Sequence, residues 1–247
     1  MKYTYILIAF YICNITTAQS IITDRPDQTE SASTIECGSL QIETGILIEN
    51  YDEDFNYLYL PTTLFRLGVT QSIELRFVNQ LEQSRHRLES VNEINKTNFG
   101  HLELGLKIRL AQYEKTELAY LTHYTFPTGS YPMPNYVESN MFHKICFSTE
   151  LNQKMNMGAN IGYMLMNDGY NRVTYSLVTG LKINEQVSTY IEPYGDISAA
   201  DHEDIVSNIN MGFTYLLKDN IQLDYSFGVG LNNESNFMSI GCSMKFE

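Results

Sequence analysis

Charged side chains recur at every second position in several stretches of the sequence, and the residues between them are apolar. In HLELGLKIRL, residues 101–110, Glu103, Lys107 and Arg109 alternate with leucine and isoleucine. Charges of both signs that share one face of neighbouring strands can pair across a wall or line a polar passage. The chemistry of these residues therefore predicts a solvated inner surface rather than a dry core.

The residues that this alternation places on the inner face are candidates for lining a lumen. They are Glu43, Glu74, Arg76, His101, Glu103, Lys107, Arg109, His123, Lys182, Glu192 and Asp224. Such charges could merely solvate and rigidify a narrow barrel, or they could form a constriction that selects solutes by size and charge. Neither sign dominates, which argues against a pore dedicated to acidic sugars.

Histidine and serine could instead serve a barrel enzyme, since twelve-stranded outer-membrane phospholipases use both on the barrel wall. His143 and Ser148 lie five positions apart on one predicted strand, so they face opposite sides. His101 and His123 share the inward phase with Glu103, and we expect wall histidines bonded to that carboxylate rather than general bases. The sequence has no zinc motif and no phosphate loop, so we predict no catalytic residue, metal or cofactor.

The start of the chain has the pattern of a secretory signal peptide. Lys2 is followed by an apolar stretch, residues 6–15, and then by the small residues Thr17 and Ala18. This predicts a leader over residues 1–18. The chain carries 16 Lys and Arg against 29 Asp and Glu, so it lacks the basic surface that nucleic-acid binding needs.

Period-two alternation dominates from Gly38 onward and predicts β-strands with one apolar and one polar face. The alternation persists for roughly 9–13 residues, close to the ~9–11 that a tilted strand needs to cross a bilayer. This length favours an all-β, transmembrane, antiparallel up-and-down barrel over a secreted soluble β-protein. About twelve strands are expected, at residues 39–50, 57–67, 72–80, 99–111, 117–126, 139–150, 155–165, 172–183, 187–197, 204–217, 220–231 and 237–246.

The connections between these strands alternate in length. Those after even strands are mostly short, such as NEQ and KD, whereas those after odd strands include the long segment 81–98. Short periplasmic turns opposite longer outside loops are typical of the outer membrane. We therefore expect residues 81–98 to form a hydrated loop outside the cell, and both termini to be periplasmic.

The segment before the first strand, residues 19–37, is polar and has no apolar periodicity. Either it is a disordered periplasmic tail, or it folds back and plugs the lumen. The plug is the interpretation we favour, because Asp24, Arg25, Asp27 and Glu30 could pair with lumen charges. The partners considered are Arg76, Lys107, Arg109 and Lys182.

The motif TDRPDQTES, residues 23–31, is followed closely by GSLQIETGILIE, residues 38–49. The pair resembles the outer-membrane transporter-like family named for the MetA pathway of phenol degradation, in the form of its Bacteroidetes-type members. The resemblance implies a small outer-membrane barrel that passes small compounds, such as hydrophobic or aromatic ones. This chain departs from the usual aromatic C-terminus of such barrels, since Glu247 follows Phe246.

Together these patterns predict a leader over residues 1–18, a periplasmic or lumen-plugging segment over 19–37 and a barrel over 38–247 in the outer membrane of a Gram-negative bacterium. The expected function is passage or binding of small solutes. The alternatives are a lipid-modifying barrel enzyme and a closed structural barrel. Expected partners are outer-membrane lipid, a small-molecule solute and, during biogenesis, the barrel-assembly machinery.

Overall fold

The computed structural model describes residues 20–51, 55–88, 91–126, 128, 140–167, 169–200 and 204–247. Thirteen strands lie in these ranges: β1 (Leu40–Asn50), β2 (Phe55–Thr70), β3 (Ile73–Leu88), β4 (Val91–Phe99), β5 (Leu102–Tyr113), β6 (Thr116–Phe126), β7 (Asn140–Glu150), β8 (Met155–Met166), β9 (Arg172–Lys182), β10 (Val187–Ser198), β11 (Ile205–Lys218), β12 (Ile221–Gly230) and β13 (Asn236–Phe246). No helix in these ranges is long and apolar enough to span a membrane.

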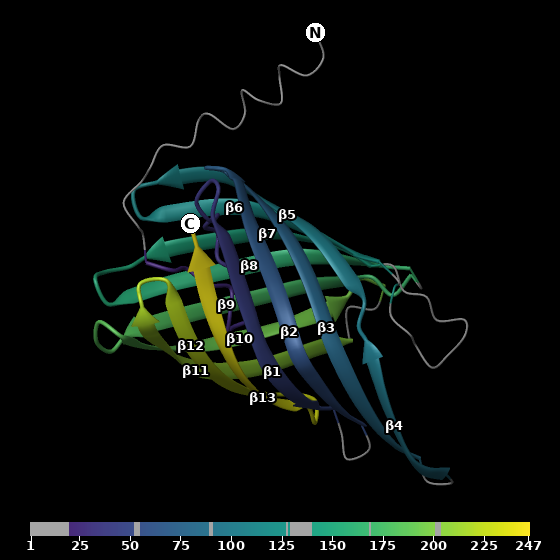
Figure 1. The fold of residues 1–247 in the computed structure, drawn as a ribbon. Helices are drawn as coiled ribbons and strands as arrows, with labels where there is room; N and C mark the ends of the chain where they lie inside the picture. Colours follow the sequence, from purple (N-terminus) through teal and green to yellow (C-terminus); the bar gives the residue numbers. More distant parts are fainter. Residues whose placement is uncertain are drawn as a thin grey trace.

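The strands form one antiparallel sheet that closes on itself (Figure 1). Each strand pairs with the next one in the chain, except that β5 pairs with β3 and not with β4, and β13 closes the wall by pairing with β1. All strands except β4 build the closed wall, so the predicted twelve-stranded antiparallel barrel is confirmed. Closure satisfies the backbone hydrogen bonds of every wall strand without leaving an edge, which a hydrocarbon environment requires.

Side chains alternate across this wall. Along β12, Leu223, Tyr225 and Phe227 are exposed on the outer face, whereas Asp224 and Ser226 are buried inside. The last strand, β13, follows the same rule, with an outward phase that ends at Phe246. An apolar exterior and a polar interior are what lipid outside and a polar lumen inside demand.

Strand β2 interrupts the alternation at Pro61. The register between β1 and β2 shifts in this region: Tyr59 pairs with Leu47, but Thr62 pairs with Gly45. A bulge of this kind reverses which face the following residues occupy. Odd-numbered residues of β2 face the lumen before the bulge, and even-numbered residues, Arg66 among them, face it afterwards.

The expectation of an irregular loop over residues 81–98 is wrong. Strand β3 continues to Leu88, and β4 returns from Val91 to Phe99 as its antiparallel partner. In Figure 1 this hairpin extends beyond the rim of the barrel. The hairpin forms because β3 keeps pairing with β2 as far as Phe55↔His86, so its backbone is held in strand geometry above the wall.

The start of β1 and the end of β13 lie at the end of the barrel that carries the short turns. Leu40, the first residue of β1, pairs with Phe246, the last residue of β13. Close to this pair, the backbone N–H of Lys245 donates to the carbonyl of Asn220 in the short β11–β12 turn. The segment that precedes β1 therefore enters the barrel from the short-turn end.

The assignment of the outer face predicts the effect of a charge placed on β8. Ile161, in the middle of this strand, is 61% exposed on the outer face. Ile161→Arg should lower the free energy of unfolding in lipid vesicles by about 2–4 kcal/mol, because it places a charge in hydrocarbon. Gln153→Arg, in the exposed β7–β8 turn, is the matched control and should leave it unchanged. Urea titration would measure both, and equal stability of the two variants would contradict the assigned facing.

Candidate functional site

The interior of the barrel is occupied by the chain's own N-terminal segment, residues 20–38. The segment begins where the backbone N–H of Ile21 donates to the carbonyl of Asp219, and it ends where Gly38 N–H donates to Gly68. Between these points it contacts side chains from β1, β2, β3, β5, β6, β7, β9, β10, β12 and β13. Figure 1 shows its described part among the wall strands.

Asp24 is the centre of the contacts. Its carboxylate lies 2.5 Å from Nη1 of Arg76, 2.9 Å from Nζ of Lys107 and 3.4 Å from Nη1 of Arg66. The side chain is only 4% exposed. Burial alone would raise the pKa of Asp24, but the three cations outweigh it and hold the pKa well below its usual range. Asp24 is therefore an anion clamped by three strands of the wall.

Carboxylates on the wall hold both the three cations and the segment's backbone. Glu43 accepts hydrogen bonds from the backbone N–H groups of Asp24 and Arg25, at 3.0 and 2.9 Å. Arg66 lies between two wall acids, 2.9 Å from Glu43 and 2.8 Å from Glu74. The buried charges thus balance one another in one continuous network.

Arg66 is a site residue that the alternation pattern missed. Strict alternation from Tyr57 would place it outside, and the bulge near Pro61 reverses the phase. A signal was available, because Arg66 stands between Phe65 and Leu67, and apolar neighbours on both sides mark an inward arginine in a lipid-facing strand.

Arg25 occupies a place that two glycines provide. Its guanidinium lies 3.0 Å from Asp224 and 2.7 Å from the Ser239 hydroxyl. Gly45 and Gly241 pair across β1 and β13, and a Cβ on either would lie 2.4 to 2.7 Å from the guanidinium atoms. The missing side chains create the space in which the guanidinium rests.

Further contacts of the segment are with β3 and with the opposite wall, β7, β9 and β10. Glu30 lies 2.9 Å from Arg76. Thr29 donates to Glu192 at 2.5 Å and is 2.8 Å from Ser176. Ala32 N–H donates to the Ser148 hydroxyl at 2.9 Å.

Asp27 differs from its neighbours. Within the described part of the chain it forms no ion pair, and it faces a cavity. Burial, and after it the nearby carboxylate of Glu192, raise the pKa of Asp27 well above its usual range. The segment therefore holds two aspartates of opposite character, one locked as an anion and one favouring the neutral acid.

The other residues that the sequence pattern assigned to the lumen lie at several places in the barrel. His123 accepts from Nε of Arg76 at 3.0 Å through Nε2, and its Nδ1 lies 3.2 Å from Glu103. Arg109 lies 3.8 Å from Glu117 near the short turns. Lys182, 41% exposed, pairs with Glu185 of the next turn and does not contact the segment. His101 lies directly before β5.

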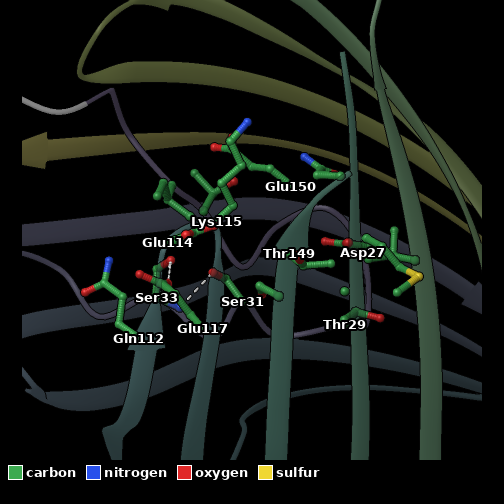
Figure 2. Close-up of a pocket in the computed structure, with 17 residues that line it drawn as sticks. Asp27, Thr29, Ser31, Ser33, Gln112, Glu114, Lys115, Glu117, Thr149 and Glu150 are labelled. Carbon is green, nitrogen blue, oxygen red and sulfur yellow. Dashed lines mark hydrogen bonds and ion pairs between the residues drawn. The ribbon is translucent and has the colours of Figure 1, made fainter. Parts of the chain in front are cut away.

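A cavity of about 470 Å³ lies between the segment and the wall of β5–β9, near the short turns (Figure 2). Asp27, Thr29, Ser31 and Ser33 contribute the segment's side, and Ser33 donates to Glu117 on the wall. Its other lining residues include Gln112, Glu114, Lys115, Ser148, Thr149, Glu150 and Asn156. The lining is mostly hydroxyl and carboxyl groups, which suits a hydrated polar solute.

His123 and His143 are not placed beside a serine hydroxyl as a catalytic base would be. Both ring nitrogens of His123 already have partners. His143 faces outward, where its Nδ1 lies 2.6 Å from the Tyr120 hydroxyl, while Ser148 faces the lumen. No group of three metal-ligating side chains occurs in the described ranges.

A closed antiparallel wall with an apolar exterior and a polar interior defines the class of outer-membrane barrels. The crystal structure of an outer-membrane channel from Pseudomonas putida F1 matches with a TM-score of 0.70 and 13% identity, covering 90% of this chain and 100% of that one. The family model "Putative MetA-pathway of phenol degradation" matches residues 23–246. The chain belongs to this family, and the match includes most of the N-terminal segment.

Two porins share the fold at lower similarity. The NanC porin matches with a TM-score of 0.59 and 10% identity, covering 83% of this chain and 100% of that one. The KdgM porin, in complex with disordered oligogalacturonate, matches with a TM-score of 0.57 and 9% identity, covering 84% and 99%. At these identities the likeness is one of fold. No curated protein sequence matches this chain.

The two aspartates of the segment predict opposite effects of the same isosteric change. Asp24→Asn leaves three buried cations short of an anion, so docking of the segment should weaken by about 3–5 kcal/mol. Asp27→Asn removes an acid that docking already favours in its neutral form, so docking at neutral pH should strengthen. Hydrogen–deuterium exchange of residues 20–38 would measure both. Equal exchange in the two variants would contradict the assigned network.

Asp24 and Asp27 also predict how docking of the segment depends on pH. The depressed pKa of Asp24 means that its contribution to docking is present above the unfolded pKa of about 3.9 and is lost only as pH falls through the lower, docked value. The raised pKa of Asp27 means that docking weakens as pH rises from about 3.9 through the docked value. After correction for intrinsic rates, exchange protection should therefore increase from pH 7 to pH 5, and Asp27→Asn should abolish that increase.

Proposed function

We propose that this protein is an outer-membrane channel that binds or passes small solutes, and that its N-terminal segment acts as a plug. The observation that supports the plug most is Asp24, which is clamped by cations from β2, β3 and β5. A solvated periplasmic tail would gain nothing from such a buried network. In this proposal, the charged wall residues that face the lumen bind the plug and also line the route that a solute takes.

The cellular setting forms part of the proposal. Residues 1–18 act as a leader, residues 19–37 as the plug, and residues 38–247 as the barrel. Both termini and the short turns face the periplasm of a Gram-negative, Bacteroidetes-type host. The outward apolar face contacts outer-membrane lipid, and the barrel-assembly machinery inserts the chain.

The choice of solute rests on the family and the lumen together. The family description names phenol degradation, which favours small aromatic or hydrophobic compounds. The lumen adds a requirement, because any such solute must pass a wall of charged and hydroxyl side chains. A passing compound should therefore carry a polar group.

The two rival functions have less support. A lipid-modifying enzyme needs a serine beside a base, and His123 and His143 have partners other than serine hydroxyls. A closed structural barrel would fit a permanently seated plug. It differs from a channel in one measurable respect, namely whether the lumen conducts once the plug is removed.

Deletion of residues 22–31 tests the proposal in planar bilayers. Removal of the plug leaves a lumen lined by charged groups that water can fill, so single-channel conductance should rise several-fold while the barrel stays folded. Gln28→Ala is the control, because the Gln28 side chain is exposed and only its backbone N–H contacts Glu192. Unchanged conductance in the folded deletion variant would favour the closed structural barrel.

A further inference from the structure

The long-loop end of the lumen holds aromatic rings beside carboxylates. Glu49 lies on the same face of β1 as the buried Glu43, which is the face toward the lumen. Tyr57 lies directly opposite Glu49 in the register of β1 and β2, and Tyr59 lies opposite Glu82 in the register of β2 and β3. Because directly opposed residues on neighbouring strands share one face of the sheet, these side chains face the lumen together.

The rings are in contact with one another. The ring centroids of Tyr51 and Tyr57 lie 5.6 Å apart in an edge-to-face arrangement, and those of Tyr57 and Tyr59 lie 6.1 Å apart and stacked. The Tyr51 side chain lies close to the Glu49 carboxylate. We call Glu49, Tyr51, Tyr57 and Tyr59 the tyrosine site.

The carboxylates at this end lack cationic partners. Among the described residues, neither Glu49 nor Glu82 forms an ion pair. The described basic groups on the opposite side are engaged elsewhere, since Nζ of Lys144 lies 4.6 Å over the Phe142 ring and Arg172 pairs with Asp204. The tyrosine site therefore offers a negative charge and several ring faces, and the described part of the chain supplies no cation to it.

Rings and a carboxylate together favour one class of ligand. The face of an aromatic ring attracts a cation, and quaternary ammonium groups are recognised in this way. A carboxylate beside the rings adds a direct charge pair. A neutral aromatic compound could stack on the rings but would leave Glu49 uncompensated, and an anion would be repelled.

The opposite end of the lumen has the same bias through different residues. The cavity near the short turns is lined by the carboxylates of Glu114, Glu117 and Glu150, and by one basic side chain, Lys115. Excess negative charge at both ends of a narrow polar passage raises the local concentration of cations.

We propose that the protein selects small organic cations and that the tyrosine site binds them on the long-loop side of the plug. The selection of what passes rests on the proposed channel function. Binding at the tyrosine site needs no open lumen, so the two can be tested separately.

Isothermal titration calorimetry on the refolded full-length protein tests the site, with choline as the probe. Its neutral isostere, 3,3-dimethyl-1-butanol, has the same shape without the charge. Choline should bind, and the alcohol should bind at least about tenfold more weakly. Equal affinity for the two compounds, or no choline binding at millimolar concentration, would overturn the proposal.

Two substitutions test whether choline binds at the tyrosine site. Glu49→Gln keeps the shape of the side chain and removes the charge, so choline affinity should fall about tenfold or more. Tyr57→Leu should also weaken binding, whereas Glu185→Gln, in an exposed turn at the other end, should leave it unchanged. Unaltered affinity in a folded Glu49→Gln variant would overturn the assignment of the site.

The outcomes separate this inference from the proposed function. If choline binds specifically but the deletion of residues 22–31 does not conduct, the channel proposal fails and the binding site stands. If the deletion variant conducts but the protein binds the alcohol as well as it binds choline, the channel stands and organic-cation selection is wrong.

Discussion

The ion pairs of Asp24 are the interactions on which the interior of this barrel depends. A buried charge is costly unless it is paired, and the wall places Arg66, Arg76 and Lys107 within a few ångströms of one another. Glu43 and Glu74 of the wall offset part of their repulsion, and Asp24 of the N-terminal segment contacts all three cations. The segment and the wall are therefore mutually dependent: the segment has no core of its own, and without it the cluster of Arg66, Arg76 and Lys107 would have only the carboxylates of Glu43 and Glu74 against its three cations.

The closed wall follows from the need to satisfy backbone hydrogen bonds in lipid. Strands in lipid must satisfy every backbone hydrogen bond within the sheet, and a closed antiparallel barrel does so. This is why period-two alternation and strand length predicted the fold and nearly all strand positions. The exception was β4, because residues 91–96, VNEINK, carry polar and charged side chains like a loop. The pairing that holds β4 comes from the length of β3, which no local pattern shows.

The site could be predicted in part. Polarity and charge indicated that Asp24, Arg25 and Glu30 had partners in the lumen, and alternation placed Arg76, Lys107 and Asp224 there. Three features needed coordinates: the bulge that turns Arg66 inward, the paired glycines 45 and 241 that make room for Arg25, and the Thr29–Glu192 contact. Each depends on how distant strands pair, which the alternation of a single strand does not contain.

The most direct test of this account asks whether the segment lies against the wall where the charge network places it. The hydroxyl oxygens of Thr29 and Ser176 are 2.8 Å apart. In refolded Thr29→Cys/Ser176→Cys protein, a disulfide should therefore form under mild oxidation and appear as a linked peptide by mass spectrometry. The pair Thr29→Cys/Gln153→Cys should not link, because Gln153 lies in an exposed turn. No Thr29–Ser176 link in a folded barrel would contradict the central claim that the segment is docked in the lumen.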